Sequence, residues 1–218
     1  MNNQNSTPAN FDPTVLRDLK DLFKIREVAG GYEIYDGLSE DLVDYVVPDC
    51  VVSIGENAFS EFDSLETLTI PKTVRHIDTT AFDGYNCPEV INLSLSCELV
   101  NDLKSRNYGF QDIIDPGDIC NLNVSFDPNI TVIPQNLFSY TGITVLDLRN
   151  ASVQTIEDSA FASCSDLEKI YFGDTVSQIS DTAFENCSYV EEVCLTHNCP
   201  LGIRALHDIF DVCEITRE

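Results

Sequence analysis

The residues best suited to chemistry lie close together near the C-terminal end of the sequence. Cys194, His197 and Cys199 follow one another within six residues, and Cys187 and Cys213 are nearby. Thiolate sulfur and imidazole nitrogen are ligands that Zn²⁺ prefers, so the pattern C-x2-H-x-C is compatible with a zinc site. Its spacing differs from that of a standard zinc knuckle. We therefore predict no metal and no other cofactor, and keep zinc binding by these residues as the alternative.

Histidine, the commonest general base, is scarce and scattered. The three histidines are His76, His197 and His207. Catalysis by a Cys–His or Ser–His–Asp arrangement needs a nucleophile, a base and an orienting group that converge on one pocket. The sequence contains no nucleophile elbow, no phosphate-binding loop and no paired-carboxylate motif. We predict that the protein is not an enzyme and has no catalytic residues.

Charge is the extreme feature of the composition. Twelve basic residues against 37 acidic ones give a net charge of −25. Such a surface repels phosphate backbones and anionic lipids, which argues against nucleic acid or a membrane as a partner. It permits a basic protein partner, and it also keeps a protein soluble. We expect a monomer.

The segments that direct a chain to membranes or out of the cell are missing from the sequence. No stretch approaches the roughly 18 apolar residues of a membrane span, and the first ten residues lack the basic and apolar regions of a signal peptide. The nine cysteines show no paired spacing, which favours a reducing compartment. We expect a cytoplasmic protein, or a secreted or surface protein if an export signal has been removed.

A repeat of 23 residues predicts the structural elements that must position these residues. The pattern V-x-x-I-x-x-x-A-F recurs, and its isoleucine stands at Ile54, Ile77, Ile156 and Ile179. The segment after it, for example 65–70, alternates apolar and polar residues as a strand with one buried face does. One such unit leaves its apolar face uncovered, so the units must stack on one another. The sequence predicts a solenoid.

Two cysteines occupy one equivalent position in this repeat. Cys164 and Cys187 stand where the first array has Phe62 and Tyr85. The position thus favours bulk and apolarity, and we predict that both cysteines are buried and structural.

Helix signals interrupt and flank the repeats. Asp12 is a candidate N-cap with Pro13 at the first helical position. Segment 87–95 lines up with 187–195 at an offset of 100, which favours an internal duplication. The two arrays then form one continuous solenoid or bend at the insert between them. The predicted organisation is a disordered tail at 1–10, a capping helix at 11–29, a first array at 30–97, a helical insert at 98–127, a second array at 128–196 and a helical cap at 197–218.

The full repeat, V-x-x-I-x-x-x-A-F-x-x-C-x-x-L-x-x-I-x-[IF]-P, resembles the BspA-like leucine-rich repeat family over roughly residues 40–95 and 128–196. The resemblance implies a leucine-rich repeat solenoid, a right-handed β/α superhelix of mostly short strands with helical caps and a helical insert. It also implies an interaction role, because members of the family are often secreted or surface proteins that bind host or matrix proteins. The family has no shared catalytic residues.

The outward-facing residues of the strands are the candidate binding site. Between the two inward positions of successive strands we place one column of residues, Thr69, Ser94, Asp147, Tyr171 and Cys194. Solenoids bind partners through such rigid ladders, and Tyr171 is the candidate anchor because aromatic residues are enriched at hot spots. The predicted protein-binding residues are Thr69, Ser94, Asp147, Tyr171, Glu168, Lys169 and Glu192. The alternative is an ordinary solvated sheet face.

Three functions follow from these observations. The first is a non-enzymatic scaffold for protein–protein interaction that binds its partner on the strand face. The second is an acidic inhibitor or immunity-type protein that neutralises a basic partner, and it predicts binding that weakens steeply with salt. The third is a secreted or surface adhesin module that lacks its export signal.

Overall fold

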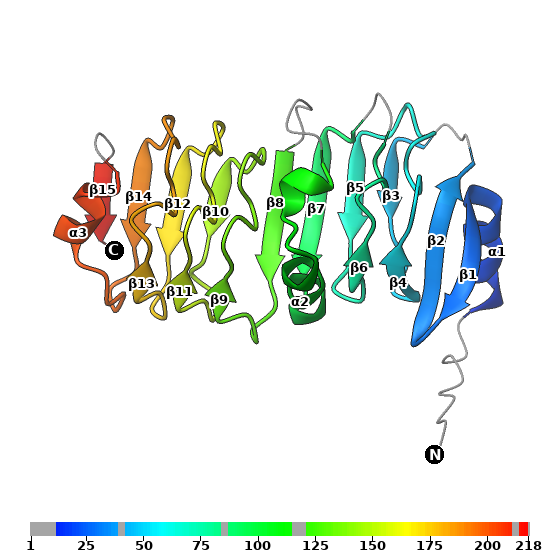
Figure 1. Cartoon of the computed structure of the whole chain (residues 1–218), viewed down its shortest axis with the longest axis horizontal. Coiled ribbons are helices and arrows are strands. Elements are labelled where there is room, and N and C mark those ends of the chain that lie inside the picture. Colours follow the sequence, from blue (N-terminus) through cyan, green and yellow to red (C-terminus); the bar gives the residue numbers. More distant parts are fainter. Residues whose placement is uncertain (1–11, 39–41, 84–86, 115–120, 211–213, 218) are drawn as a thin grey trace, which may run out of the picture.

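A computed structural model describes residues 12–38, 42–83, 87–114, 121–210 and 214–217. The tail predicted at 1–10 and the candidate ligand Cys213 lie outside these ranges. The described chain is an elongated coil whose strands stand in two rows along its long axis (Figure 1). Neighbouring strands in both rows pair in parallel, except for one antiparallel pair at the N-terminal end.

One row carries the outward-facing column and is called the strand face here. Its strands are β3 (Asp44–Val46), β5 (Thr67–Ile70), β7 (Val90–Leu95), β8 (Asn121–Phe126), β10 (Val145–Asp147), β12 (Lys169–Phe172), β14 (Glu192–Leu195) and β15 (Glu214–Arg217). They form two four-stranded sheets, β3-β5-β7-β8 and β10-β12-β14-β15. The two sheets meet at an isolated parallel bridge between Asn121 and Gly142.

The other row, called the second face, is shorter and interrupted. Its strands are β1 (Phe23–Val28), β2 (Gly31–Gly37), β4 (Val51–Ile54), β6 (His76–Ile77), β9 (Val132–Ile133), β11 (Thr155–Ile156) and β13 (Gln178–Ile179). They form the sheets β1-β2-β4-β6 and β13-β11-β9. Ile54 pairs with Ile77, and Ile156 with Ile179, so each turn of the coil advances by one repeat. The predicted period of 23 residues and the predicted stacking are confirmed.

A ladder of phenylalanine rings runs through the core. Phe59 stacks on Phe82 with centroids 5.3 Å apart. A second run of stacked rings has centroid separations of 5.2–5.3 Å and consists of Phe110, Phe138, Phe161 and Phe184. Phe110 comes from the insert between the arrays and belongs to the same buried cluster as both arrays. The arrays therefore share one continuous core across the insert.

The insert contains α2 (Cys97–Arg106) and a short 3-10 helix, η1 (Phe110–Asp112). In the order of the second face, α2 stands between β6 and β9, where a strand is missing (Figure 1). The prediction of a helical insert over 98–127 is wrong for its end, because 121–126 is the strand β8. The reason is visible in the alternation of Leu122, Val124 and Phe126, whose side chains face the core while polar neighbours face outward.

Two residues, one on each side of α2, leave the flanking strands β6 and β9 without open hydrogen-bonding groups at this interruption. In four other turns, the residue after the second-face strand donates its N–H to the preceding strand, as Glu157 does to the oxygen of Ile133 at 3.0 Å. The residue in the equivalent place after β9 is Pro134, which has no N–H to donate. On the β6 side, the guanidinium of Arg106 supplies the missing donor to the main-chain oxygen of Ile77 at 2.9 Å.

The N-terminal cap differs from the prediction in its second half. Helix α1 (Pro13–Leu22) begins as predicted, with Asp12 accepting the N–H of Thr14 at 2.8 Å. The helix predicted over 11–29 ends at Leu22, because 23–28 is the strand β1, which forms a hairpin with β2. Gly30 has a φ of +89°, and this left-handed conformation makes the tight turn of the hairpin possible.

The C-terminal cap is also only partly helical. Helix α3 spans Ile203–His207, and Leu206 and Phe210 cover the last turn of the core. The remainder of the predicted helical cap includes β15, which pairs with β14 and extends the strand face. Within the described residues, no helix is long and apolar enough to cross a membrane.

Candidate interaction surface

The candidate metal ligands of the zinc alternative form no metal site among the residues that the structure describes. Cys194 is buried on β14, where its Sγ contacts Oγ1 of Thr216 at 3.1 Å and a carboxylate oxygen of Glu192 at 3.2 Å. Cys199 is buried and directs its Sγ to the oxygen of Val176 at 3.8 Å. In the part of the chain that the structure describes, no three His, Cys, Asp or Glu side chains are placed to hold a metal ion.

His76, one of the three histidines, joins two elements of the fold. Its Nδ1 lies 3.1 Å from a carboxylate oxygen of Asp102 on α2. Asp102 also accepts from Arg106 at 2.6 Å. These contacts fix α2 against β6, and they give His76 a structural role.

The two cysteines at the shared repeat position act as hydrogen-bond donors to the previous turn. Cys164 donates to the oxygen of Phe138, and Cys187 to that of Phe161, each at 3.0 Å. Cys164 is fully buried as predicted, whereas Cys187 is half-buried. The neighbouring Cys164 thiol and then burial raise the pKa of the Cys187 thiol above its ordinary value, so this thiol stays protonated.

The predicted column is in register in the second array, although Cys194 at its end is buried, and it is out of register in the first array. Asp147, Tyr171 and Cys194 are paired in register across β10, β12 and β14. Thr69, however, pairs with Asn92 and not with Ser94. Ser94 lies two residues further along, because β7 has six residues where β5, β12 and β14 have four. Thr69 pairs with Asn92 as Tyr171 pairs with Cys194, and in each array the two partners are 23 residues apart. The repeat positions of the two arrays therefore correspond at an offset of 102 residues and not of 100.

The strand face has two chemically different halves. Over β5, β7 and β8 its outward side chains are uncharged, namely Thr67, Thr69, Val90, Asn92, Ser94, Asn121, Asn123 and Ser125. Adjacent side chains hydrogen-bond across the strands, as Asn123 does to Asn92 at 3.0 Å. Over β10 to β15 charged residues return, and Lys169 lies 3.5 Å from Glu192. A surface without charge is unusual on a chain this acidic.

The predicted anchor, Tyr171, is part of a composite of three side chains. The guanidinium of Arg149 lies 4.3 Å from the centroid of the Tyr171 ring. Arg149 also donates to both carboxylate oxygens of Asp147, at 3.0 and 2.6 Å. The side-chain hydrogen bond from Arg149 lowers the pKa of the Asp147 carboxyl, with support from the Arg149 N–H and charge. The sequence analysis did not include Arg149, because it lies beyond the end of β10. Its position two residues after Asp147 could have indicated an ion pair between the two side chains.

A column of four glutamates borders the strand face. Each precedes the first paired residue of its strand, and the members are Glu66, Glu89, Glu168 and Glu191. All four are exposed. Glu168 belongs to the predicted site, and Glu89 was missed. Like charges in adjacent turns repel one another, so this rim favours a cationic partner.

Two exposed apolar side chains on the strand face were also missed. Val46 is 64% exposed on β3, level with Thr69, and Val145 is 45% exposed on β10, level with Lys169. Each of them lies on the first strand of a four-stranded sheet, Val46 on β3 and Val145 on β10. The register of the repeat could have predicted their exposure, because it places both residues on the outward side of their strands.

Comparison with known proteins agrees with this architecture. The sequence profile described as "BspA type Leucine rich repeat region" matches residues 33–112 and 118–207 in six copies. No curated protein matches the chain closely enough to count as a relative.

Among solved structures, the chain is similar to a leucine rich cell surface protein from Faecalibacterium prausnitzii A2-165, with 20% identity and a TM-score of 0.43. That match covers 84% of this chain and 39% of the other, so this chain spans well under half of that protein's length. A leucine rich repeat protein of T. pallidum matches with 18% identity and a TM-score of 0.41, over 90% of this chain and 79% of the other.

Proposed function

The chain belongs to the BspA-type leucine-rich repeat family, and we propose that it is a non-enzymatic scaffold that binds a protein partner on its strand face. The observation that carries this proposal is the ladder of in-register side chains over β3 to β15. A row of parallel strands holds these side chains rigidly, so binding costs little conformational entropy. The composition of the ladder, with exposed apolar groups between polar ones, is typical of protein interfaces.

The composite of Asp147, Arg149 and Tyr171 is the proposed anchor of the interface. Tyrosine and arginine are enriched among the residues that dominate binding energy. Here the Arg149 guanidinium is already oriented by Asp147 and by the Tyr171 ring. A partner meets a preorganised group, and the exposed Val145 at the start of the same strand adds apolar area.

The test compares charge-matched variants with a purified partner identified by cross-linking. Val145→Glu places a negative charge on the strand face, and Gln178→Glu places the same charge on the exposed second face at β13. We expect Val145→Glu and Tyr171→Ala to weaken binding by about tenfold or more, which corresponds to about 1.4 kcal/mol, while Gln178→Glu leaves it unchanged. A partner that is insensitive to both strand-face variants would exclude this site.

The glutamate column supports a second candidate, an acidic inhibitor that occupies a basic site on its partner. Exposed charge pairs are screened by salt, so such a complex must lose affinity steeply as ionic strength rises. The variants Glu66→Gln with Glu89→Gln, and Glu168→Gln with Glu191→Gln, should each flatten that dependence. Binding that is insensitive to salt would exclude this function and favour apolar contact on the strand face.

For localisation we propose a reducing compartment such as the cytoplasm. Cys50, Cys164 and Cys199 are buried thiols in the core, and buried thiols of this kind are typical of reducing surroundings. Cell fractionation with a C-terminal epitope tag tests the proposal. Recovery at the cell surface or in the medium would instead favour the adhesin alternative.

A further inference from the structure

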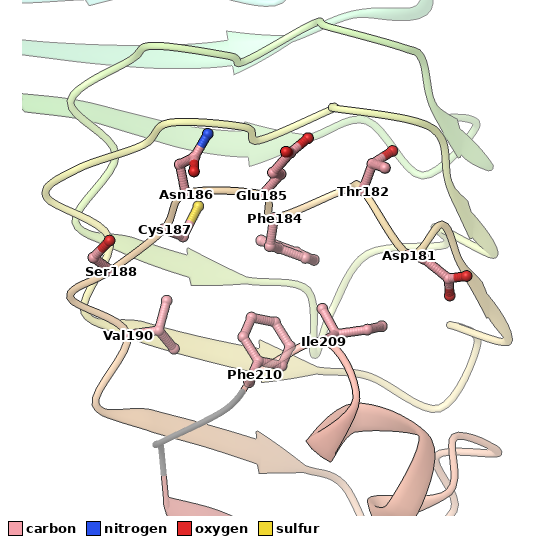
Figure 2. Close-up of a pocket in the computed structure, with 10 residues that line it drawn as sticks. All are labelled: Asp181, Thr182, Phe184, Glu185, Asn186, Cys187, Ser188, Val190, Ile209 and Phe210. Carbon is pink, nitrogen blue, oxygen red and sulfur yellow. The ribbon is translucent and has the colours of Figure 1, made fainter.

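A pocket of about 500 Å³ lies where the insert meets the second array, and it is called the insert pocket here. One of its walls is the chain from the end of α2 to η1, and the other is the segment 134–137 after β9. It differs from the pocket of about 490 Å³ at the C-terminal end, where Phe210 of the cap packs on Phe184 and covers the core (Figure 2). The lining of the insert pocket is mainly polar.

The two walls of the insert pocket are joined by hydrogen bonds. The N–H of Phe110 in η1 donates to the main-chain oxygen of Leu137 at 2.8 Å, which holds the insert against the segment after β9. Within the insert, the carboxylate of Asp112 accepts the N–H of Gly109 at 2.8 Å. A ligand therefore meets a preformed site, and its binding does not have to order these segments first.

Four amide side chains line the insert pocket, namely those of Asn107, Gln111, Gln135 and Asn136. The Oε1 atom of Gln111 is buried and has no hydrogen-bond partner among the described residues. A buried acceptor without a donor costs free energy, so this atom favours a ligand that brings a donor. Each amide can both donate and accept, and so can a hydroxyl group. The lining therefore matches a ligand with several hydroxyl groups.

The charges at the insert pocket nearly balance one another. Among the described residues that line it, Lys104, Asp112 and Glu157 are charged. Both carboxylates already accept main-chain N–H groups, Asp112 that of Gly109 and Glu157 that of Gln135 at 3.0 Å. One positive and two negative groups give no large excess of either sign. On a chain as acidic as this one, such a lining favours a neutral ligand over an anionic or a cationic one.

Tyr108 adds an aromatic surface to the insert pocket. Its side chain is 41% exposed, and the guanidinium of Arg106 lies over the ring, 5.1 Å from its centroid. Arg106 thus restrains the ring, which offers an apolar surface against which C–H groups can pack. A pyranose ring combines the two properties that this lining requires, because it has hydroxyl groups around its edge and C–H groups on its faces.

We propose that the insert pocket binds a neutral pyranose ring, either of a free sugar or of one unit of a glycan. A hydroxyl group of the sugar donates to Oε1 of Gln111, others exchange hydrogen bonds with the amides of Asn107 and Asn136, and a C–H face packs on Tyr108. This site is separate from the strand face and does not depend on the function proposed above.

The probes are glucose, galactose, mannose and N-acetylglucosamine, each as the free sugar and as its methyl glycoside. Two charged probes are compared with them: methyl glucuronide, which carries a carboxylate on the same ring, and N-acetylargininamide, which is cationic. Binding to the full chain is measured by saturation-transfer NMR and by amide ¹H–¹⁵N spectra. Methyl glycosides that bind as well as the free sugars indicate a unit of a glycan, whereas binding of free sugars alone indicates a soluble sugar.

We expect at least one neutral sugar to bind at millimolar concentration, and both charged probes to bind at least about tenfold more weakly than it does. The amide signals of Gly109 and Asn136 should move on binding. That of Tyr171, on the strand face, should not move, because the two sites are separate.

Two variants with matched controls test the proposed contacts. Gln111→Leu removes the amide and should weaken sugar binding by about tenfold or more. It should not lower the free energy of unfolding, because the Oε1 atom that it removes has no partner among the described residues. Tyr108→Ala should also weaken sugar binding. The controls Gln154→Leu and Tyr189→Ala, at exposed positions outside the insert pocket, should leave it unchanged.

The proposal is overturned if no neutral sugar binds at millimolar concentration, or if a charged probe binds more tightly than every neutral sugar. Tighter binding of N-acetylargininamide would assign the pocket to a basic protein segment instead. Sugar binding that survives both Gln111→Leu and Tyr108→Ala, or that moves the amide of Tyr171 and not that of Asn136, would place the sugar elsewhere on the chain and exclude the insert pocket.

Discussion

The guanidinium of Arg106 lies 2.9 Å from the main-chain oxygen of Ile77, where other turns place a backbone N–H. The same side chain contacts Asp102 at 2.6 Å. Arg106→Met keeps the aliphatic stem and removes both contacts, which leaves the Ile77 carbonyl without its donor. We expect a loss of about 1–3 kcal/mol in the free energy of unfolding, measured with urea.

The control for this variant is Lys104→Met in the same helix. Lys104 is exposed, so its replacement should change stability by no more than about 0.5 kcal/mol. If the two methionine variants were equally stable, Arg106 would not be the group that closes the edge of β6.

Phe110 should connect the stability of the two arrays. It is 2% exposed and stacks on Phe138 with centroids 5.2 Å apart. Among the described residues of the insert, Phe110 contributes the only ring that is stacked in the ladder. Phe110→Ala removes this ring and leaves a cavity. We expect a loss of about 3–5 kcal/mol and a broader unfolding transition in calorimetry, because neighbouring turns stabilise each other only through contact. Tyr108→Ala, at an exposed neighbour, should keep a single sharp transition.

Cys164 and Thr141 donate to one carbonyl and should be interchangeable as its partner. Thr141 Oγ1 lies 2.7 Å from the oxygen of Phe138, and Cys164 Sγ lies 3.0 Å from it. Either single change to valine leaves one donor in place, whereas the double variant leaves a buried oxygen without any of its side-chain donors. A double-mutant cycle should give a coupling of about 1–3 kcal/mol. Strict additivity would contradict this account.

The Asp147 carboxyl should titrate below its ordinary pKa of 3.8, because Arg149 hydrogen-bonds its ionised form. A lowered pKa in the folded state means that the stabilisation is present above the unfolded value and is lost as pH falls through the folded value. Arg149→Gln should return the carboxyl titration, followed by NMR, towards 3.8. The stability difference between this variant and wild type should be present at about pH 6 and vanish near pH 2.

The sequence could predict the features that the repeat itself encodes. The isoleucine and phenylalanine of the repeat point inward wherever the period holds, as Ile156 and Phe161 do with no exposed surface. The column through Asp147, Tyr171 and Cys194 was predictable for the same reason, since these strands have regular spacing. Ser94 was misplaced because β7 is longer than β5, β12 and β14, and an offset counted across an insert does not preserve register.

The remaining differences arise where local pattern and tertiary contact compete. Phe23 and Ile25 continue the apolar spacing of α1, but they also alternate with polar residues before Gly30 and Gly31. The segment 23–28 forms a strand because it pairs with β2. The contacts of Arg149 with Tyr171 and Asp147 depend on how the chain turns after β10, and neither the period nor the spacing fixes that turn.

Pro134 has a consequence for how copies of this chain behave together. A broken sheet exposes a strand edge inside the molecule, and such edges are templates for aggregation and domain swapping. At this break, Pro134 follows β9 and has no N–H to donate. The guanidinium of Arg106 on α2 donates to the main-chain oxygen of Ile77 on β6, so that acceptor is already used. The coil can therefore accommodate a helix in the middle of its length without offering other copies a place to add a strand there.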